Sequence, residues 1–483
     1  MRLSRLTAEV RALETSLRAG SDDSDSRVVL ERLSDPGSYI LELGFFMGQP
    51  LNGDRDSTRA AALLTQVAAL TAISGRPALF TTVPSGADHP EVIRIGLRKL
   101  QRTQEIALRC RVPLVYRMSP SRGQPVAPAR MLEVAALLKS LFKVPQVVLS
   151  DGGPCSAGVL GALAGQVIND DEGGICRLRE LLGRAVPDGE SAATSVPPRL
   201  DAAGLYQSLP NDHRMSYDMR RVLSGIVDGD GWFEFQPDVA PEMICAQARI
   251  DGIEIGVLAN ARGMFREPRT GEPRIGGIIY TETAEKCAYF IDAMDHYGIP
   301  ILFVQDVSGF MLGVEAEQSG IIRAGARFVE AMATARVPRL VLTVNHASGA
   351  GYYAMAAQGF EPDFLFTWPT GRMGAMEGES AVNALFAPQL ETLRRSGQKP
   401  DALLQGRMDR VRADYERWLD ARTAAASGFV DAIIAPEDTR PALSLALRAA
   451  RENRGSHLIP CRTPLDLYEW GQTPFIKGIR SHS

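Results

Sequence analysis

The sequence has few cysteines and no long apolar run, and both shortages exclude classes of protein. Its six cysteines lie at positions 110, 155, 176, 245, 287 and 461, with no CxxC pair and no histidine at zinc-ligand spacing. Structural zinc and a disulfide framework are therefore not expected. No apolar stretch has the length of a signal peptide or membrane span, and the first residues are charged throughout, so a cytoplasmic protein is expected.

The chain also lacks an excess of either charge. Lys and Arg total 53 against 57 Asp and Glu, a net charge of -4 without a long run of one sign, so nucleic acid is not an expected partner. A length of 483 residues exceeds what one core usually organises. A stretch rich in Pro, Ser, Ala and Gly, 184–200, is typical of a linker. We therefore predict two domains, 1–190 and 201–483.

What the chain does contain is an internal repeat. Residues 106–161 and 293–354 each run through a helix-like stretch, Val/Ile-Pro, an apolar strand, a turn, a second helix, Val-Pro, a strand and a small-residue turn. From the second proline to the last glycine, Pro145 to Gly158 and Pro338 to Gly351, the spacing is thirteen residues in both copies. A repeat of this kind predicts two related units with two related turns.

Short apolar runs indicate mixed α/β structure. Residues 301–306 (ILFVQD) and 340–345 (LVLTVN) are rich in β-branched residues and are separated by a helical stretch, which is typical of buried parallel strands. Around Asp251-Gly252, two strand-like runs predict a hairpin. Residues 91–110 predict a longer helix.

The turn after 340–345 is the first candidate site. Gly349, Ala350 and Gly351 carry almost no side chain and lead directly into a helix beginning at Tyr352. Free amides there, with the positive end of a helix dipole, suit an oxyanion such as a thioester enolate. Close packing of helix against strand is the alternative, because it also requires small residues. The repeat of the turn at 155–158 favours function.

The loop 305–313 is the second candidate. Asp306 is either a catalytic carboxylate or, as is common at a strand end, a cap for the following turn. Phe310 and Met311 line a pocket or belong to the core. His346 adjoins the small-residue turn and suggests a general base, but a lone histidine is more often structural, so we assign it no role.

These residues carry a resemblance to a known family. The segment 282–382 resembles, collinearly, the carboxyltransferase family of biotin-dependent acyl-CoA carboxylases and decarboxylases, within the crotonase-like superfamily. Segments 211–218, 240–252 and 263–280 are most similar to the glutaconyl-CoA decarboxylase alpha subunit, and the later stretch to methylcrotonyl-CoA carboxylase beta subunits. The resemblance implies an α/β fold of two crotonase-like (ClpP/crotonase) ββα-superhelix domains.

The resemblance also implies that the two domains bind different substrates. The first domain receives the acyl-CoA, the second receives carboxybiotin, and the site forms between opposite domains of two protomers. Gly349, Ala350 and Gly351 correspond to the turn that holds the biotin oxyanion, and Gly158 and Val159 occupy the acyl-side positions. The residues that shape the pocket are Asp306, Ser308, Gly309, Phe310 and Tyr352. No metal is implied.

The first half departs from the family pattern. The expected Gly-Gly-Ala-Tyr turn reads Gly158-Val159-Leu160-Gly161, which brings bulk to the acyl-side turn. Residues 166–171 run directly into a helical stretch, without an evident counterpart of the strand 363–369. We therefore predict a truncated first domain in which acyl-CoA binding is altered or lost.

The favoured hypothesis is a carboxyltransferase subunit that moves a carboxyl group between carboxybiotin and an acyl-CoA or related acceptor. Because the chain has neither a Met-Lys-Met biotinylation tripeptide nor a P-loop, biotin is expected on a separate carrier, with biotin carboxyl carrier and biotin carboxylase subunits as partners in a homo- or hetero-oligomer. Three alternatives stay open. They are a decarboxylase alpha-like subunit working in reverse, a noncatalytic or half-site subunit paired with a paralogue, and a biotin-independent crotonase-type hydratase or isomerase.

Overall fold

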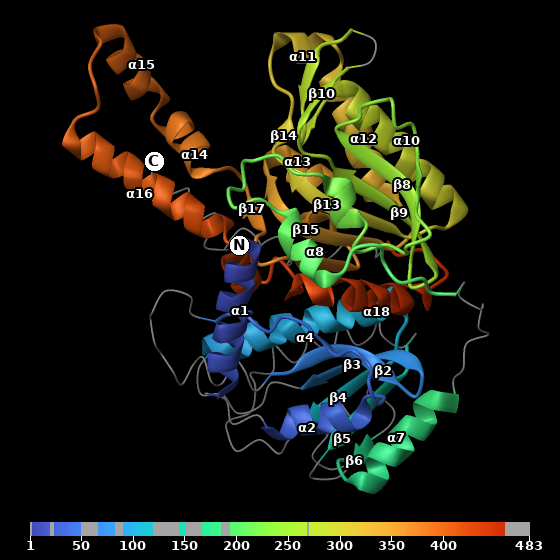
Figure 1. The fold of residues 1–483 in the computed structure, drawn as a ribbon. Coiled ribbons are helices and arrows are strands. Elements are labelled where there is room, and N and C mark those ends of the chain that lie inside the picture. The colour runs from blue at the N-terminus through green and yellow to red at the C-terminus, as the bar shows by residue number, and fades with distance from the viewer. Residues whose placement is uncertain are drawn as a thin grey trace.

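The protein was analysed as a computed structural model, which describes residues 2–19, 24–49, 66–82, 90–118, 144–150, 167–184, 194–267 and 270–458. Within these ranges the chain forms two sheets stacked with helices between and outside them (Figure 1).

The first sheet is built from the amino-terminal half. Its six strands lie in chain order, β1 to β6, with β1–β2–β3 antiparallel and β3 to β6 parallel. Their bounds are β1 Leu41–Glu42, β2 Ala68–Ile73, β3 Arg76–Thr82, β4 Leu114–Met118, β5 Gln146–Ser150 and β6 Val167–Asn169.

The second sheet is built from the carboxyl-terminal half. Its order is β18-β16-β15-β13-β9-β8-β7, with β17 beside the end of β15; β7, β8 and β9 are antiparallel and the remaining pairs are parallel. The strands are β7 Phe233–Glu234, β8 Met243–Ile250, β9 Ile253–Asn260, β13 Ile301–Val307, β15 Arg339–Ser348, β16 Phe364–Thr367, β17 Arg372–Gly374 and β18 Ala432–Ile433. Two small pairs lie beside it, β10 Met264–Arg266 with β11 Pro273–Ile275, and β12 Ile278–Ile279 with β14 Gly309–Phe310.

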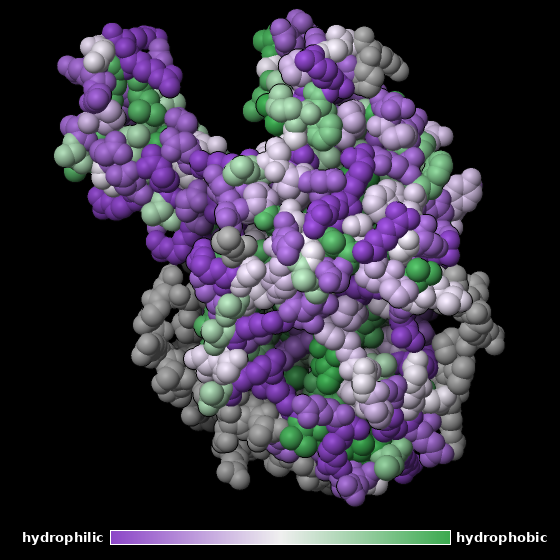
Figure 2. Space-filling model, in the orientation of Figure 1, coloured by the Kyte–Doolittle hydropathy of each residue, from purple (hydrophilic) through white to green (hydrophobic). Residues whose placement is uncertain are grey.

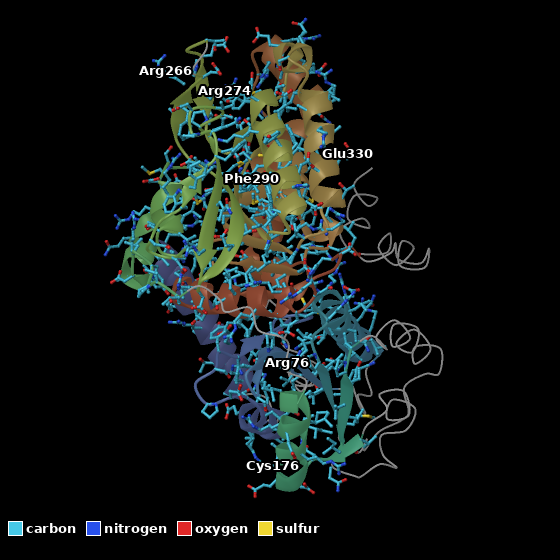
Figure 3. All side chains as sticks on the ribbon, turned by 90° about the vertical axis from the view of Figure 1, so that its right-hand side faces the viewer. Arg76, Cys176, Arg266, Arg274, Phe290 and Glu330 are labelled. Atoms are coloured by element: carbon cyan, nitrogen blue, oxygen red, sulfur yellow. The ribbon has the colours of Figure 1, made fainter. Side chains whose placement is uncertain are left out.

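Helices fill three layers. The layer between the sheets holds α4 (Pro90–Cys110) and α18 (Thr439–Arg451), whose apolar side chains share one core with both sheets. The outer face of the first sheet packs on α2 (Ser24–Leu33) and α7 (Glu172–Arg184). The outer face of the second packs on α10 (Thr281–Tyr297), α12 (Ile321–Thr334) and α17 (Ala421–Ala426), and Figure 3 shows Phe290 of α10 inside that layer.

The remaining helices lie at the edges. Helix α1 (Arg2–Ala19) places Leu3 in the central core and Val10 in the outer core of the second sheet. An arm projects from the second sheet and has a small core of its own (Figure 1). The arm comprises α14 Gly378–Leu385, α15 Ala387–Ser396 and α16 Ala402–Leu419; the short helices are α8 Ala202–Ser208, α9 Met219–Leu223, α11 Val314–Gln318, α13 Gly349–Ala354, η3 Gln358–Phe360 and η4 Pro436–Asp438.

The internal repeat is visible in the strand order. In each sheet an antiparallel hairpin is followed by three parallel strands, β2-β3-β4-β5-β6 in the first and β8-β9-β13-β15-β16 in the second. One prediction was wrong. The three-residue strand β6 lies beside β5 as β16 lies beside β15, within the segment where no counterpart was expected. The other aspects of the predicted truncation, and the domain boundary, stay predictions.

Local sequence explains the second hairpin. Asp251 and Gly252 have φ values of 53° and 74°, the left-handed pair that a two-residue turn between twisted strands requires, and Asp and Gly tolerate that region best. The predicted hairpin, the parallel strands β13 and β15 and the helix α4 are all confirmed.

A buried ion pair ties the two halves together. Arg102 of α4 donates to both carboxylate oxygens of Asp431, at 2.7 and 2.8 Å, and Asp431 also accepts the amide of Leu365 in β16. The side chain of Asp431 is 6% exposed. Since removing one partner leaves the other charge buried, this pair is a strong determinant of stability.

We predict that Asp431→Ala lowers the free energy of unfolding by about 3–5 kcal/mol, because Arg102 loses its partner. The matched control is Asp292→Ala, which removes the partner of Arg327 in an ion pair whose side chains are 47% and 48% exposed. It should cost less than about 1 kcal/mol. Urea unfolding followed by circular dichroism measures both; equal losses would contradict the prediction.

Candidate functional site

The two predicted loops meet at one edge of the second sheet. Strands β13 and β15 are parallel neighbours, so their carboxyl ends lie together and Val307 pairs with Ala347. Helix α13 then starts at Gly349. A Cβ on Gly351 would lie 2.6 Å from Val307 Cγ2 and 2.9 Å from Gly309 Cα. Only glycine allows this approach, so part of the small-residue pattern does serve close packing.

The amides of residues 349–351, the glycine turn, remain available. Gly349 has a φ of +62° and is partly exposed, and Ala350 is exposed. The first amides of a helix have no acceptor within it. Outside the regular ladders, no hydrogen bond among the described residues uses the amide of Ala350 or Gly351. Helix α13 has only six residues, so these amides matter more than its dipole.

Asp306 lies behind the glycine turn and is fully buried. Its Oδ2 accepts a hydrogen bond from the Tyr217 hydroxyl at 2.6 Å and another from Asn345 Nδ2 at 3.2 Å. Arg262 Nε lies 3.6 Å from the same oxygen. The capping interpretation of Asp306 was therefore wrong, because the carboxylate faces other elements rather than its own turn.

Burial raises the pKa of Asp306, although Arg262, the hydrogen bonds from Tyr217 and Asn345 and the amide of His346 all act to lower it. Its Oδ1 has no hydrogen-bond partner of ordinary geometry among the described residues. Burial also holds the pKa of the Tyr217 hydroxyl well above its usual value. The carboxyl group is thus a buried group with a raised pKa, which is the property of a candidate acid or base.

A layer of polar contacts fixes this carboxyl group. Asn345 donates to Asp306 and to the carbonyl of His213, while its own Oδ1 accepts from Arg2 Nη1 at 3.0 Å. The amide of Asp306 donates to Asn260 Oδ1 at 3.1 Å. All hydrogen-bonding groups of the Asn345 amide therefore have partners, which sets its orientation.

The loop beyond β13 is largely exposed. Ser308 donates its amide to Gly277, and Arg262 Nη1 lies 3.4 Å from its hydroxyl. Phe310 is partly exposed, and Leu312 and Val314 are 84% and 70% exposed. Figure 2 shows apolar side chains gathered on this face beside α11 and β10.

The structure brings most of the predicted residues together. Asp306, Ser308, Gly309 and the glycine turn meet at the ends of β13 and β15. Tyr352 is only 8% exposed and packs in the outer core of the second sheet. The acyl-side positions Gly158 and Val159 lie outside the described residues.

Sequence reasoning missed the partners of the buried carboxyl group. Tyr217 lies in the segment 211–218 and Arg262 directly precedes 263–280, both segments compared with the decarboxylase subunit. Asn345 is the last residue of the strand that leads to the glycine turn. Nothing in the sequence pointed to Arg2, since a separation of 343 residues leaves no local signal.

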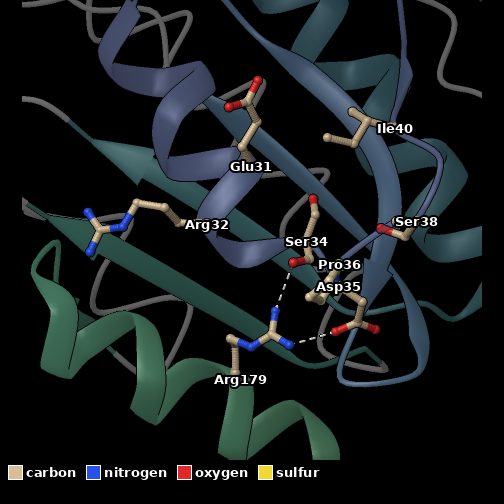
Figure 4. Close-up of a pocket in the computed structure, with 9 residues that line it drawn as sticks. Glu31, Arg32, Ser34, Asp35, Pro36, Ser38, Ile40 and Arg179 are labelled. Atoms are coloured by element: carbon tan, nitrogen blue, oxygen red, sulfur yellow. Dashed lines mark hydrogen bonds and ion pairs between the residues drawn. The ribbon is translucent and has the colours of Figure 1, made fainter.

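Two surface hollows lie away from the ends of β13 and β15. A surface hollow of about 510 Å³ between α2 and α7 is lined by Asp35 and by Arg179, which donates to that carboxylate and to the Ser34 carbonyl (Figure 4). A smaller one of about 170 Å³ lies under α1. Within the described residues, no acidic, histidine or cysteine side chains form a metal-binding group, and no helix is both long and apolar enough to cross a membrane.

Comparison with known proteins identifies the family. The carboxyl transferase domain matches residues 158–463, more than half of the chain. The chain belongs to the carboxyl transferase family. This confirms the family and the reaction class predicted from the sequence.

Two relatives match along most of their length. The biotin-dependent 3-methylcrotonyl-coenzyme A carboxylase beta1 subunit of Mycobacterium tuberculosis is 29% identical over 483 residues, covering 86% of this chain and 87% of that protein. The mitochondrial methylcrotonoyl-CoA carboxylase beta chain of Arabidopsis thaliana is 28% identical, with 87% and 80% covered. The beta subunit of geranyl-CoA carboxylase from P. aeruginosa has the same fold, with a TM-score of 0.75, 23% identity and 95% of both chains covered.

We predict that Asp306→Asn makes the protein more stable at pH 7 while lowering carboxyl transfer. Because burial raises the pKa of Asp306, its ionisation costs stability, and this cost appears as the pH rises through the folded-state pKa. The greater stability of Asp306→Asn should therefore be present at pH 7 and shrink as the pH falls toward 3.8, the ordinary pKa of an aspartic acid.

Thermal unfolding between pH 4 and pH 8 measures this difference. The exposed substitution Asp414→Asn is the control and should leave the pH dependence unchanged. A variant that is less stable than the wild type at pH 7 would show that the contact with Arg262 outweighs burial.

Proposed function

We propose that this chain is the carboxyltransferase subunit of a biotin-dependent acyl-CoA carboxylase, with the glycine turn as the biotin-side oxyanion hole. The single observation that carries the proposal is the position of the Ala350 and Gly351 amides. They lie where β15 ends and α13 begins, beside the loop 307–310, with Ala350 exposed.

The chemistry of carboxyl transfer fits these groups. Bound biotin supplies a ureido nitrogen that carries the carboxyl group, and negative charge gathers on the ureido oxygen when that group leaves. Fixed main-chain donors stabilise such a charge without reorganising. Ala350 and Gly351 are the residues that would hold the ureido group. Neither has a side chain larger than a methyl group, and the missing side chain of Gly351 allows its close approach to Gly309.

The buried carboxyl group has a second role in the proposal. Asp306, oriented by Tyr217 and Asn345, is a buried carboxyl group at the end of the neighbouring strand and holds or releases a proton. Ser308, Gly309 and Phe310 form the adjoining wall, and Tyr352 supports the turn from the core. Gly158 and Val159 are proposed for the acyl side, with a CoA thioester as substrate.

Partners follow from the proposed chemistry. A carboxyl group must arrive on biotin, so a biotin carrier and a biotin carboxylase are required, on separate subunits of an oligomer with the site between protomers. A cytoplasmic location and the absence of a metal requirement are parts of the same proposal.

The function is tested with a carrier protein whose biotin bears a radiolabelled carboxyl group, together with 3-methylcrotonyl-CoA and propionyl-CoA. Label in an acid-stable acyl-CoA product supports the proposal. Activity that appears only after a related subunit is added favours the half-site alternative. Hydration of an enoyl-CoA without biotin favours the hydratase, and net loss of carboxyl from a carboxyacyl-CoA favours the decarboxylase direction.

We predict that Ala350→Pro lowers kcat for carboxyl transfer by about 10²–10³-fold, because proline removes one donor from the oxyanion hole. The second position of a helix otherwise tolerates proline, since its amide makes no intrahelical bond. Steady-state kinetics with the labelled carrier measures the effect.

Two controls accompany this variant. Ala350→Gly keeps the amide and should retain most activity. Ala402→Pro places proline at the first position of α16 in the projecting arm and should leave both folding and turnover unchanged. Full activity in a folded Ala350→Pro variant would exclude this amide from the site.

A further inference from the structure

A chain of polar groups lies directly behind the glycine turn. Ser348 Oγ is 2.9 Å from His346 Nε2, and His346 Nδ1 faces Glu377 Oε1 at 3.6 Å. Ser348 and His346 are buried, with 6% and 4% exposure. Serine, imidazole and carboxylate in this order, next to main-chain amides, have the arrangement of a hydrolase triad. The positions of the protons decide whether they act as one.

The proton of Ser348 already has an acceptor. Its Oγ donates to the carbonyl of Ser308 at 3.3 Å, and a hydroxyl group has only one proton. With this proton on the Ser308 side, we assign the His346 proton to Nε2, which donates to Ser348 Oγ, so that Nδ1 carries none. Among the described residues Nδ1 has no hydrogen-bond partner. In this arrangement His346 cannot take a proton from Ser348, as the base of a triad must.

Burial keeps His346 neutral. Burial lowers the pKa of His346 to about 4; Glu377 opposes this shift, while Arg372, Arg262 and His213 add to it. Glu377 stays ionised beside it, because His213, whose Nε2 lies 3.4 Å from Glu377 Oε1, is the first cause that lowers the pKa of Glu377 to about 2. The rings of His213 and His346 stack with centroids 6.5 Å apart, and a nitrogen of each lies within 3.6 Å of Glu377 Oε1.

The contacts join three separate parts of the site. Ser348 is the last residue of β15 and the N-cap of α13, Ser308 follows β13, and Glu377 is the N-cap of α14. The hydrogen bond between Ser348 and Ser308 joins the residue before the glycine turn to the loop 307–310.

We propose that Ser348 and His346 are positioning residues for carboxyl transfer, a clamp that fixes the direction of the turn amides, and not a nucleophile with its base. This inference deepens the proposed function and rests on it. Glu377 and His213 are neighbours of the imidazole, with Glu377 Oε1 3.6 Å from Nδ1 and the ring of His213 6.5 Å away.

The first test distinguishes a positioning role of Ser348 in catalysis from a purely structural role. Ser348→Ala removes both hydrogen bonds, and we expect kcat to fall about tenfold with the KM for the carrier within about twofold, because the charge on the oxyanion develops only in the transition state. Ser348→Thr keeps a hydroxyl group and should restore most of the activity. Ser396→Ala, at the exposed end of α15, is the control and should have no effect.

The second test needs no substrate. Hydrogen exchange of the peptide covering residues 349–352 should be faster in Ser348→Ala and in His346→Ala than in the wild type, and unchanged in Ser396→Ala. Equal exchange in all four proteins would overturn the clamp. If the wild type transfers no carboxyl group at all, the proposed function fails, and this exchange experiment still judges the clamp.

The third test addresses the hydrolase interpretation. A fluorophosphonate probe and a p-nitrophenyl ester are offered to the wild type, and we expect neither labelling of Ser348 nor ester hydrolysis above the level of Ser348→Ala. Stoichiometric labelling at Ser348 would show that its proton reaches His346 and would overturn the proposal.

Discussion

The close approach of Gly351 to Val307 and Gly309 is the contact on which the rest of the site depends. Two parallel strands end at the same edge of the sheet, and the helix that follows one of them packs on the loop that follows the other. No residue with a Cβ permits that distance. At this turn Gly349 is partly exposed and Ala350 is exposed, and the hydrogen bond from Ser348 reaches the neighbouring loop.

Burying the carboxyl group of Asp306 beside this contact costs free energy of folding. Packing alone does not explain why a carboxyl group occupies the position. Asp306 is fully buried, its pKa is raised, and one of its oxygens has no described partner. A neutral polar residue would suit a purely structural position better. Groups of this kind are concentrated at functional sites, where stability and activity oppose each other. The network through Asn345 to Arg2 makes the first helix of the chain part of the site's support.

Much of the fold was predictable because its signals are local. The hairpin at Asp251-Gly252, the strands β13 and β15, and the small-residue turn each have a sequence pattern shorter than about a dozen residues. Strand β6 was missed because three residues are too few to show an alternating period, and its identity depends on pairing with β5. The capping interpretation of Asp306 failed for a related reason, since local statistics contain no information on a tyrosine 89 residues away.

The sequence by itself determined the repeated α/β unit, the family and the small-residue turn, because these follow from the spacing of apolar and small residues along the chain. Only the tertiary structure decided which polar groups act together. Tyr217, Arg262 and Glu377 come from separate loops, and folding places them around the ends of two strands. It also placed an acceptor within reach of the Ser348 hydroxyl. The acceptor, the carbonyl of Ser308, lies 40 residues away, and such contacts depend on the packing of whole elements rather than on neighbouring residues.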